Sequence, residues 1–528
     1  MKTRVSRRSI SLVWGLGVMV WPMAVSRAQL TDTTQTPNTA NVGIHRSLAD
    51  QVGAGRGDVM TPDSSLFIIK RDPFRSVRRG RQIFQRKFTV AQGFSPRTGD
   101  GVGNIDTDGS LGAGLVDSCA GCHGRPHGGA GFGGNVFTRP DSRDAPHLFG
   151  LGIVEMLADE ITHDLRAIRQ QAIDEAQQEN EPETRLLVSK GIHYGYITAM
   201  PDGTVNTSNV HGVNADLRVR PFFAQGGTIS MREFIVGAFN AEMGLEAPDP
   251  DLAAASAGGR VVTPAGMVLD GSLDTIEAPP VSSPFEDGDG VVNEIPTALV
   301  DHVEFYLLNY FKPGLYKSTK KTRKGRNKFE AIGCAFCHVP DLLIEHDRRV
   351  ADVETNYSAS EPGFNHLFTV ATTLFDVIDD GSGLPPLKRP QGGPFLVRNI
   401  YADFRSHDLG PKFNERNFDG TITTRFMTEP LWGVGTTAPY GHDGRSINLT
   451  EVILRHGGEA QASRDAFVAM GGAGRSQILA FLNSLILFPP GDTASNLNPG
   501  DPSTPGFPQF GHGSIKLGVL FNDPSIGE

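Results

Sequence analysis

The chain contains little cysteine, little tryptophan and no excess of basic charge. Four cysteines and three tryptophans occur in 528 residues. The formal net charge of −10 argues against a nucleic-acid partner, although an acidic surface can still bind a basic protein such as a small cytochrome. Beyond Ala28, no apolar run is long enough to cross a bilayer. We therefore expect a mature protein without a membrane-spanning segment, long enough for two or three domains.

Residues 1–28 have the pattern of a secretory signal peptide. Four basic residues among the first eight precede an apolar stretch over residues 10–25, and Ser26–Ala28 offers small residues for cleavage. A membrane anchor is the alternative, but the apolar stretch is short and contains Pro22. We therefore predict that the signal peptide is removed and that the protein is periplasmic or otherwise exported from a bacterial cytoplasm.

All four cysteines lie in two copies of the motif C-x-x-C-H, at residues 119–123 and 334–338. A thioredoxin-type redox pair has no need of the histidine, a zinc ion would bind adjacent Cys and His awkwardly, and a disulfide across three residues would be strained. The motif is typical of covalent c-type haem attachment, in which the histidine binds the iron. We predict two covalent haems, one held by Cys119, Cys122 and His123 and the other by Cys334, Cys337 and His338.

The residues around each motif predict a duplicated helical unit. Gly325 and Phe329 fall on a helix that leads to the second motif, and Gly80 and Phe84 repeat their spacing ahead of the first. Apolar faces in residues 230–244 and 475–488 predict helices that close the two units. We expect a mainly α protein with two cytochrome c-like haem domains and long irregular loops. The predicted organisation is a signal peptide (1–28), an irregular N-terminal segment (29–75), a first haem domain (76–246), a linker (247–296), a second haem domain (297–488) and an irregular tail (489–528).

A second axial ligand for the second iron is predicted at His456. Asn448 is a typical N-cap, and His456 follows Leu449, Val452 and Ile453 at helical spacing on one apolar face. The alternative is a core histidine that is only hydrogen-bonded. The need of a buried iron for a ligand favours His456 as the ligand.

Several segments resemble one family. TAPYGHDGRSINLTEVILRH (437–456) is similar to the C-terminal signature of bacterial di-haem cytochrome c peroxidases. Other segments are more similar to the di-haem oxidoreductase branch of that superfamily, which is sometimes labelled thiol-oxidoreductase-like. These are APHLFGLGIVEML (145–157), TISMREFIVGAFNAEMG (228–244), GCAFCHVPDL (333–342), YADFRSHDLG (401–410) and LWG (431–433). The resemblance spans most of residues 76–488.

The resemblance implies roles for further residues. It implies that His442 and Arg445 bind propionates of the second haem, and that the His123 haem has an open or weakly held position for peroxide. Proton transfer to peroxide needs a nearby acid or base. Glu155, in an apolar run where the pKa of a carboxyl would be raised, is the first candidate, and His147 and Glu160 are alternatives. An ordinary ion pair of Glu155 is the competing interpretation.

The chain departs from the family in two places. His456 stands where the peroxidases usually carry methionine and where protein-modifying relatives carry tyrosine, and histidine lowers the reduction potential relative to methionine. Relatives also carry a tryptophan between the haems in the first domain, whereas the mature chain has only Trp432. Trp432 is either an electron relay or a packed side chain in a turn.

These observations predict a di-haem, peroxidase-like oxidoreductase. It would activate peroxide or oxygen at the N-terminal haem, with electrons passed through the C-terminal haem from a small redox protein or another donor. The alternatives are a pure electron-transfer cytochrome and high-valent haem oxidation of a protein or polymer substrate. Acidic stretches at residues 104–109 and 286–290 suggest calcium, but neither has a complete calcium-loop spacing, so solvated turns are the competing interpretation.

Overall fold

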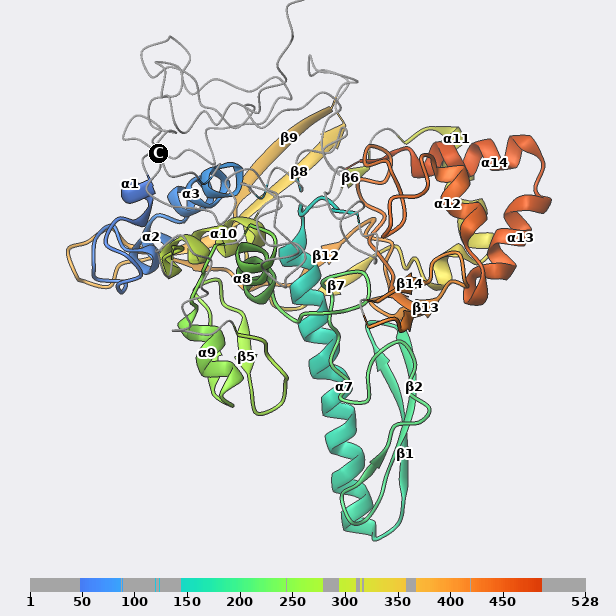
Figure 1. Ribbon diagram of the computed structural model, residues 1–528, viewed down its shortest axis with the longest axis horizontal. Coiled ribbons are helices and arrows are strands. Elements are labelled where there is room, and N and C mark those ends of the chain that lie inside the picture. Colours follow the sequence, from blue (N-terminus) through green and yellow to red (C-terminus); the bar gives the residue numbers. More distant parts are fainter. Residues whose placement is uncertain are drawn as a thin grey trace, which may run out of the picture.

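The computed structural model describes residues 48–86, 88, 119, 123, 144–243, 245–278, 294–309, 314–315, 318–357, 367–417 and 419–486. Its α-helices lie mainly in two groups, with small sheets and the base of a projecting arm between them (Figure 1). The helices are α1 (Leu48–Val52), α2 (Ser65–Arg71), α3 (Pro73–Gln85), α7 (Leu151–Glu179), α8 (Met231–Ala241), α9 (Pro250–Ser256), α10 (Thr297–Asn309), α11 (Lys320–Ala331), α12 (Leu449–Arg455), α13 (Gln461–Ala469) and α14 (Gly472–Leu482). Short 3-10 turns, η3 (Cys334–Phe336) and η5 (Gly458–Ala460), follow α11 and α12.

Two helix pairs repeat one packing arrangement. A Cβ atom at Gly325 of α11 would lie 1.9 Å from the carbonyl oxygen of Gln477 of α14, and a Cβ atom at Gly80 of α3 would lie 2.0 Å from that of His302 of α10. Each glycine therefore permits a close helix crossing that any side chain would prevent. Four residues on, Phe329 meets Phe481 at 5.5 Å between ring centroids.

In the first pair, Phe84 meets Tyr306 at 5.9 Å between ring centroids. The glycine, the aromatic residue four positions later and the partner helix thus recur in both pairs, as expected of a duplicated unit. The closing helix of the first pair is α10, whereas the sequence favoured residues 230–244. That segment forms α8, where Ser230 caps the helix by accepting the N–H of Glu233 at 3.1 Å.

The prediction of a mainly α fold is wrong, because short strands occupy much of the chain between the helices. In the described residues they form one three-stranded and seven two-stranded sheets. Most strands have only two to four residues, too few to show an alternating pattern in the sequence. The larger strands are β1 (Glu183–Ser189), β2 (Ile192–Ala199), β8 (Ala351–Tyr357) and β9 (Leu367–Thr373), and the shorter ones are β3 (Val205–Asn206), β4 (Arg260–Val262), β5 (Val268–Asp270), β6 (Gly314–Leu315), β7 (Leu342–Ile344), β10 (Phe375–Ile378), β11 (Leu387–Pro390), β12 (Phe395–Val397), β13 (Ser406–Asp408), β14 (Glu415–Arg416), β15 (Ile422–Thr423), β16 (Arg425–Met427) and β17 (Leu485–Ile486).

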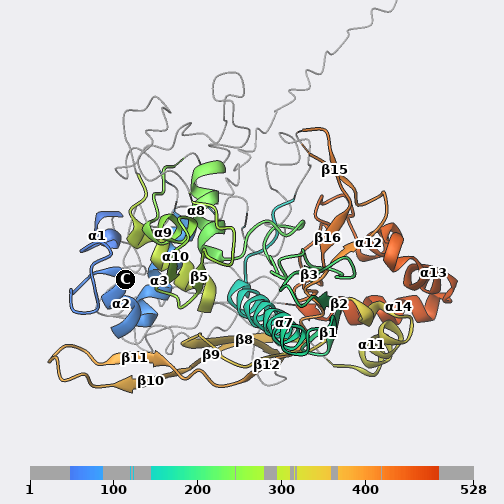
Figure 2. The ribbon, with the colours of Figure 1, turned by 90° about the horizontal axis from the view of Figure 1, so that it is seen from below.

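An arm projects from the body between the two helix groups. It consists of α7 and the antiparallel sheet β1-β2-β3, which lies along the outer half of the helix (Figure 1). Seen from below, the hairpins β8–β9 and β10–β11 run along one side of the molecule beneath α2 and α10 (Figure 2). The N-terminal half of α7 is buried and connects the arm to the core.

The buried apolar side chains form two clusters. The larger contains α3, α7, α8 and α10, and it also takes in Leu342, Val397 and Trp432 from later in the chain. The smaller lies among α11, α12, α13 and α14, with Phe481 at its centre and Tyr401 against it. The predicted domain boundaries stay a prediction, although α10, at the start of the predicted second domain, packs on α3 of the first helix group. Every helix in the described ranges is too short or too polar to cross a lipid bilayer.

Candidate haem centres

The second C-x-x-C-H motif begins where α11 ends. Gly333, with φ of +89°, turns the chain into η3, and the N–H of His338 donates to the carbonyl oxygen of Cys334 at 3.0 Å. The ring Nδ1 of His338 lies 3.0 Å from the carbonyl oxygen of Tyr401. Because a carbonyl only accepts, Nδ1 carries the proton and Nε2 keeps its lone pair, which is the form that binds a metal.

His456 is the C-cap of α12 and has the same ring arrangement. Its Nδ1 lies 2.7 Å from the carbonyl oxygen of Val452, so its Nε2 also keeps a lone pair. Burial lowers the pKa of His456. Burial likewise lowers the pKa of His338 to about 4, and a charge on His456 would lower it further. Both rings are therefore neutral at physiological pH.

The first motif repeats this local structure in the residues that are described. The N–H of His123 donates to the carbonyl oxygen of Cys119 at 2.9 Å, and its Nδ1 lies 2.6 Å from that of Pro146. Burial lowers the pKa of His123. Both motifs thus place a neutral histidine one turn after the first cysteine, with the ring orientation fixed by a backbone carbonyl. Cys122 lies outside the described residues, as do both acidic stretches considered for calcium.

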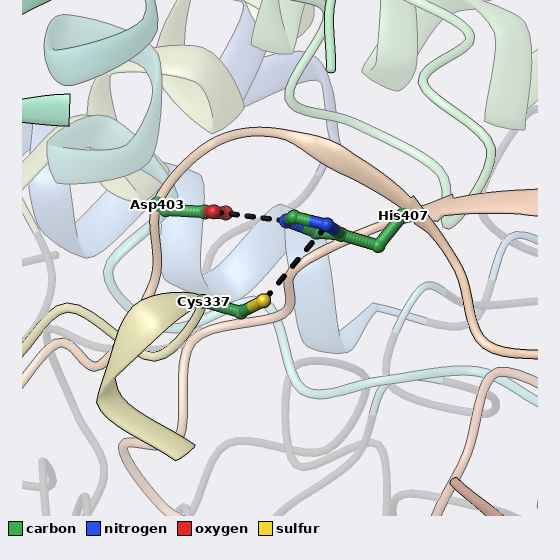
Figure 3. A group of neighbouring side chains, drawn as sticks. All are labelled: Cys337, Asp403 and His407. Carbon is green, nitrogen blue, oxygen red and sulfur yellow. Dashed lines mark hydrogen bonds and ion pairs between the residues drawn. The ribbon is translucent and has the colours of Figure 1, made fainter. Parts of the chain in front are cut away.

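A charged cluster that the sequence did not single out lies beside Cys337. His407 of β13 places its Nε2 2.9 Å from Asp403 and its Nδ1 2.7 Å from Glu459, and Nδ1 is also 3.8 Å from the sulfur of Cys337 (Figure 3). Carboxylates only accept, so both ring nitrogens carry protons and His407 is a cation. Burial opposes this charge, but hydrogen bonds to Asp403 and Cys337 raise the pKa of His407 to about 10.

Cys337, Asp403 and His407 have ligand atoms within 4.8 Å of one another, close enough to surround a metal ion. However, a cationic imidazole has no lone pair to offer. If a haem is attached to Cys337, the cluster instead places a fixed positive charge beside it. Asp403 and His407 both lie in YADFRSHDLG, which the sequence had flagged only as a family signature. Glu459 comes 52 residues after His407 and adjoins it only in the fold.

His442 and Arg445, predicted to bind propionates, lie in a loop ahead of α12. The ring of His442 stacks on Phe426 at 4.1 Å between centroids, and its Nε2 is 3.6 Å from Glu415. The side chain of Arg445 is 60% exposed and lies 3.5 Å from Asp443. Arg445 is therefore available to a carboxylate ligand, while His442 is held in the fold. Propionate binding by both stays a prediction.

The loop around His147 contacts a segment from the C-terminal half of the chain. Burial lowers the pKa of His147 to about 4, and its ring stacks on that of Phe149 at 6.1 Å between centroids. The Trp432 ring is nearly buried and packs on Gly150, where an added Cβ would come within 2.8 Å of it. Because Pro146 accepts the Nδ1 proton of His123, this loop lies on the side of the His123 ring that faces away from Nε2. The role of His147 in proton transfer to peroxide stays a prediction.

Glu155 is wholly buried in the first turns of α7. One carboxylate oxygen accepts a bond from Arg348 at 2.5 Å, and the other accepts the N–H of Met231 at the start of α8 at 2.7 Å. Burial raises the pKa of Glu155, against the opposing effect of Arg348, as the apolar run predicted. Both oxygens are thus bound within the protein. The third candidate, Glu160, pairs with Lys190 at 2.6 Å.

Residues 394–485 match the family described as "Di-haem oxidoreductase, putative peroxidase". The predicted resemblance to the di-haem peroxidase superfamily is confirmed for this segment. The matched segment contains the cluster of Asp403, His407 and Glu459, the loop of His442 and Arg445, and His456. The family description names a di-haem oxidoreductase.

No curated protein matches the chain. A solved structure described as a "Crystal structure of a MauG-like protein associated with microbial copper homeostasis" is similar at 14% sequence identity. The similarity covers 61% of this chain and 89% of that one, with a TM-score of 0.24.

The described residues fit the haems that the family description implies. Three histidines (His123, His338 and His456) are neutral, are oriented by backbone carbonyls and keep Nε2 free for iron. Cys334 and Cys337 are thiols rather than a disulfide. Phe336, between the cysteines of the second motif, has an 83% exposed ring, as expected of an apolar side chain at the edge of a flat ligand.

Proposed function

We propose that the protein is an exported di-haem c-type cytochrome oxidoreductase of the peroxidase type. A haem held by His123 would supply the chemistry that activates peroxide or oxygen, and a haem held by His338 and His456 would supply the path for electrons. The observation that carries the proposal is the shared arrangement of the His338 and His456 rings. Both Nδ1 atoms are bound to backbone carbonyls, so both Nε2 atoms would be available to hold a haem iron.

The two haem units have different roles in this proposal. Two histidine ligands leave no coordination position for substrate, so the second haem transfers electrons. In the first unit, a haem held by His123 alone would have a coordination position open to peroxide.

The chain's own residues orient these groups and connect them. The ring of Trp432 packs against Gly150, so Trp432 connects the first unit to the segment that carries His407 and His456. Glu155 connects α7 to the start of α8 by accepting the N–H of Met231. Phe234 of α8 in turn packs against the His123 ring at 6.0 Å between centroids. We assign Glu155 as a positioning residue for the first unit.

Electron paramagnetic resonance of the purified ferric protein, with and without hydrogen peroxide, tests the proposal. We expect one high-spin signal and one low-spin signal typical of two histidine ligands, with peroxide consuming the high-spin signal. Catalytic peroxide consumption with a reduced small cytochrome should accompany it. Two low-spin signals that ignore peroxide in both the ferric and half-reduced states would instead show a pure electron carrier.

A further inference from the structure

A cavity that plays no part in the proposed reaction lies under the β10–β11 hairpin. Its volume is about 240 Å³, and it lies between α2, α10, β11 and residues 346–350. The residues that line it include Lys70, Pro264, Phe305, Arg348, Val350 and Lys388. This volume is below the ~300–1,000 Å³ of most ligand pockets, so a ligand here would be small.

Two lysines bring positive charge to the cavity without a carboxylate to balance it. The ammonium of Lys70, at the end of α2, donates to the carbonyl oxygen of Pro264 at 3.3 Å, and burial lowers its pKa. Lys388 donates to the carbonyl oxygen of Pro386 at 3.5 Å and faces the ring of Phe375. In the described ranges, neither ammonium has a carboxylate oxygen within 4.0 Å.

The other charged groups at the cavity are paired among themselves. Arg348 is bound by Glu155 at 2.5 Å and by Asp159 at 3.1 Å. The carboxylate of Asp347 is bound by Arg349 at 2.7 Å. In the described ranges the two ammonium groups thus lack the ion pairs that Arg348 and Asp347 have, and a partly buried charge without a counter-ion is costly. An anion would remove that cost.

The remaining walls of the cavity are apolar. Ile69, Phe305 and Val350 are nearly or wholly buried elements of the core, and Ala265 and Pro390 complete the lining. We propose that this cavity binds a small organic carboxylate. Its carboxylate group would accept hydrogen bonds from Lys70 and Lys388, and its short apolar tail would contact the core side chains. The site does not depend on the proposed haem chemistry.

Calorimetric titration of the full-length holoprotein with hexanoate tests this proposal, with hexanamide as the uncharged comparator. Hexanoate should bind saturably and hexanamide at least about tenfold more weakly, because a hydrogen bond to a charged group contributes about 1.5–3 kcal/mol. K70M and K388M should each weaken hexanoate binding by about tenfold or more. K324M, at an exposed lysine of α11, is the matched control and should bind hexanoate as the wild type does.

Both variants are expected to fold, because methionine fills the space of the lysine stem and removes an enclosed charge. The proposal is overturned if hexanoate fails to saturate the wild type, if hexanamide binds equally well, or if K70M and K388M bind hexanoate like K324M. Titration with inorganic phosphate is a further comparison. Phosphate binding as tight as that of hexanoate would overturn the assignment to a carboxylate with an apolar tail.

Discussion

Replacing Arg348 with methionine would leave a wholly buried carboxylate without its cation. Glu155 is 0% exposed, and Arg348 also bonds to Asp159. Removing one partner of a buried ion pair typically costs about 3–5 kcal/mol. We expect R348M to lower the free energy of unfolding by about that amount at pH 9.5.

The loss should be smaller in acid, and its sign follows from the pKa of Glu155. Burial raises this pKa above its ordinary value of 4.5, and the loss of Arg348 raises it further. Above pH 4.5 the folded state of either protein holds a proton on Glu155 that the unfolded state has released, and stability falls by about 1.4 kcal/mol per pH unit until the folded-state pKa is reached. In the wild type this pKa is about 8. Above it only R348M continues to lose stability, so R348M should be closer to the wild type at pH 6 than at pH 9.5.

Denaturant unfolding at pH 6 and pH 9.5, followed by circular dichroism, measures this effect. The double variant E155Q/R348M is the control, because a neutral glutamine still accepts the N–H of Met231 but has no charge to bury. At pH 9.5 it should recover much of the lost stability, and it should show a weaker pH dependence. The reasoning is refuted if R348M unfolds within about 1 kcal/mol of the wild type at pH 9.5, or if the double variant is no more stable than R348M at that pH.

Three further variants test other parts of the account. H456A should convert the low-spin signal of the second haem to a high-spin one, and an unchanged spectrum would remove His456 as a ligand. H407Q should lower the reduction potential of the second haem in a redox titration, because a fixed positive charge beside Cys337 is lost; a potential equal to that of the wild type would contradict this role. G325A should reduce stability by about 1–3 kcal/mol through the α11–α14 crossing, whereas G471A, where an added Cβ meets nothing within 4 Å, should have little effect.

Features set by neighbouring residues could be predicted from the sequence. The helix before Cys334 forms as α11, and Asn448 caps α12 by accepting the N–H of Glu451 at 3.0 Å. Capping and helical periodicity depend on residues three or four positions apart, so they are visible in the sequence. The place of His456 at the end of that helix follows from the same spacing.

Features that depend on distant residues could not be predicted in this way. Glu155 and Arg348 are 193 positions apart, and no local pattern joins them. The helix α10 is buried all round, so it lacks the polar face that would have marked it as the partner of α3. The small sheets were missed for a related reason, because their strands are short and most of their pairing is set by the surrounding fold.

The central claim is that both C-x-x-C-H motifs hold haem, and mass spectrometry of the purified protein tests it most directly. Intact mass should exceed that of the mature chain by two haem groups, with the modified peptides containing Cys119 and Cys122 in one case and Cys334 and Cys337 in the other. Titration of four free thiols, with no added haem mass, would contradict the account.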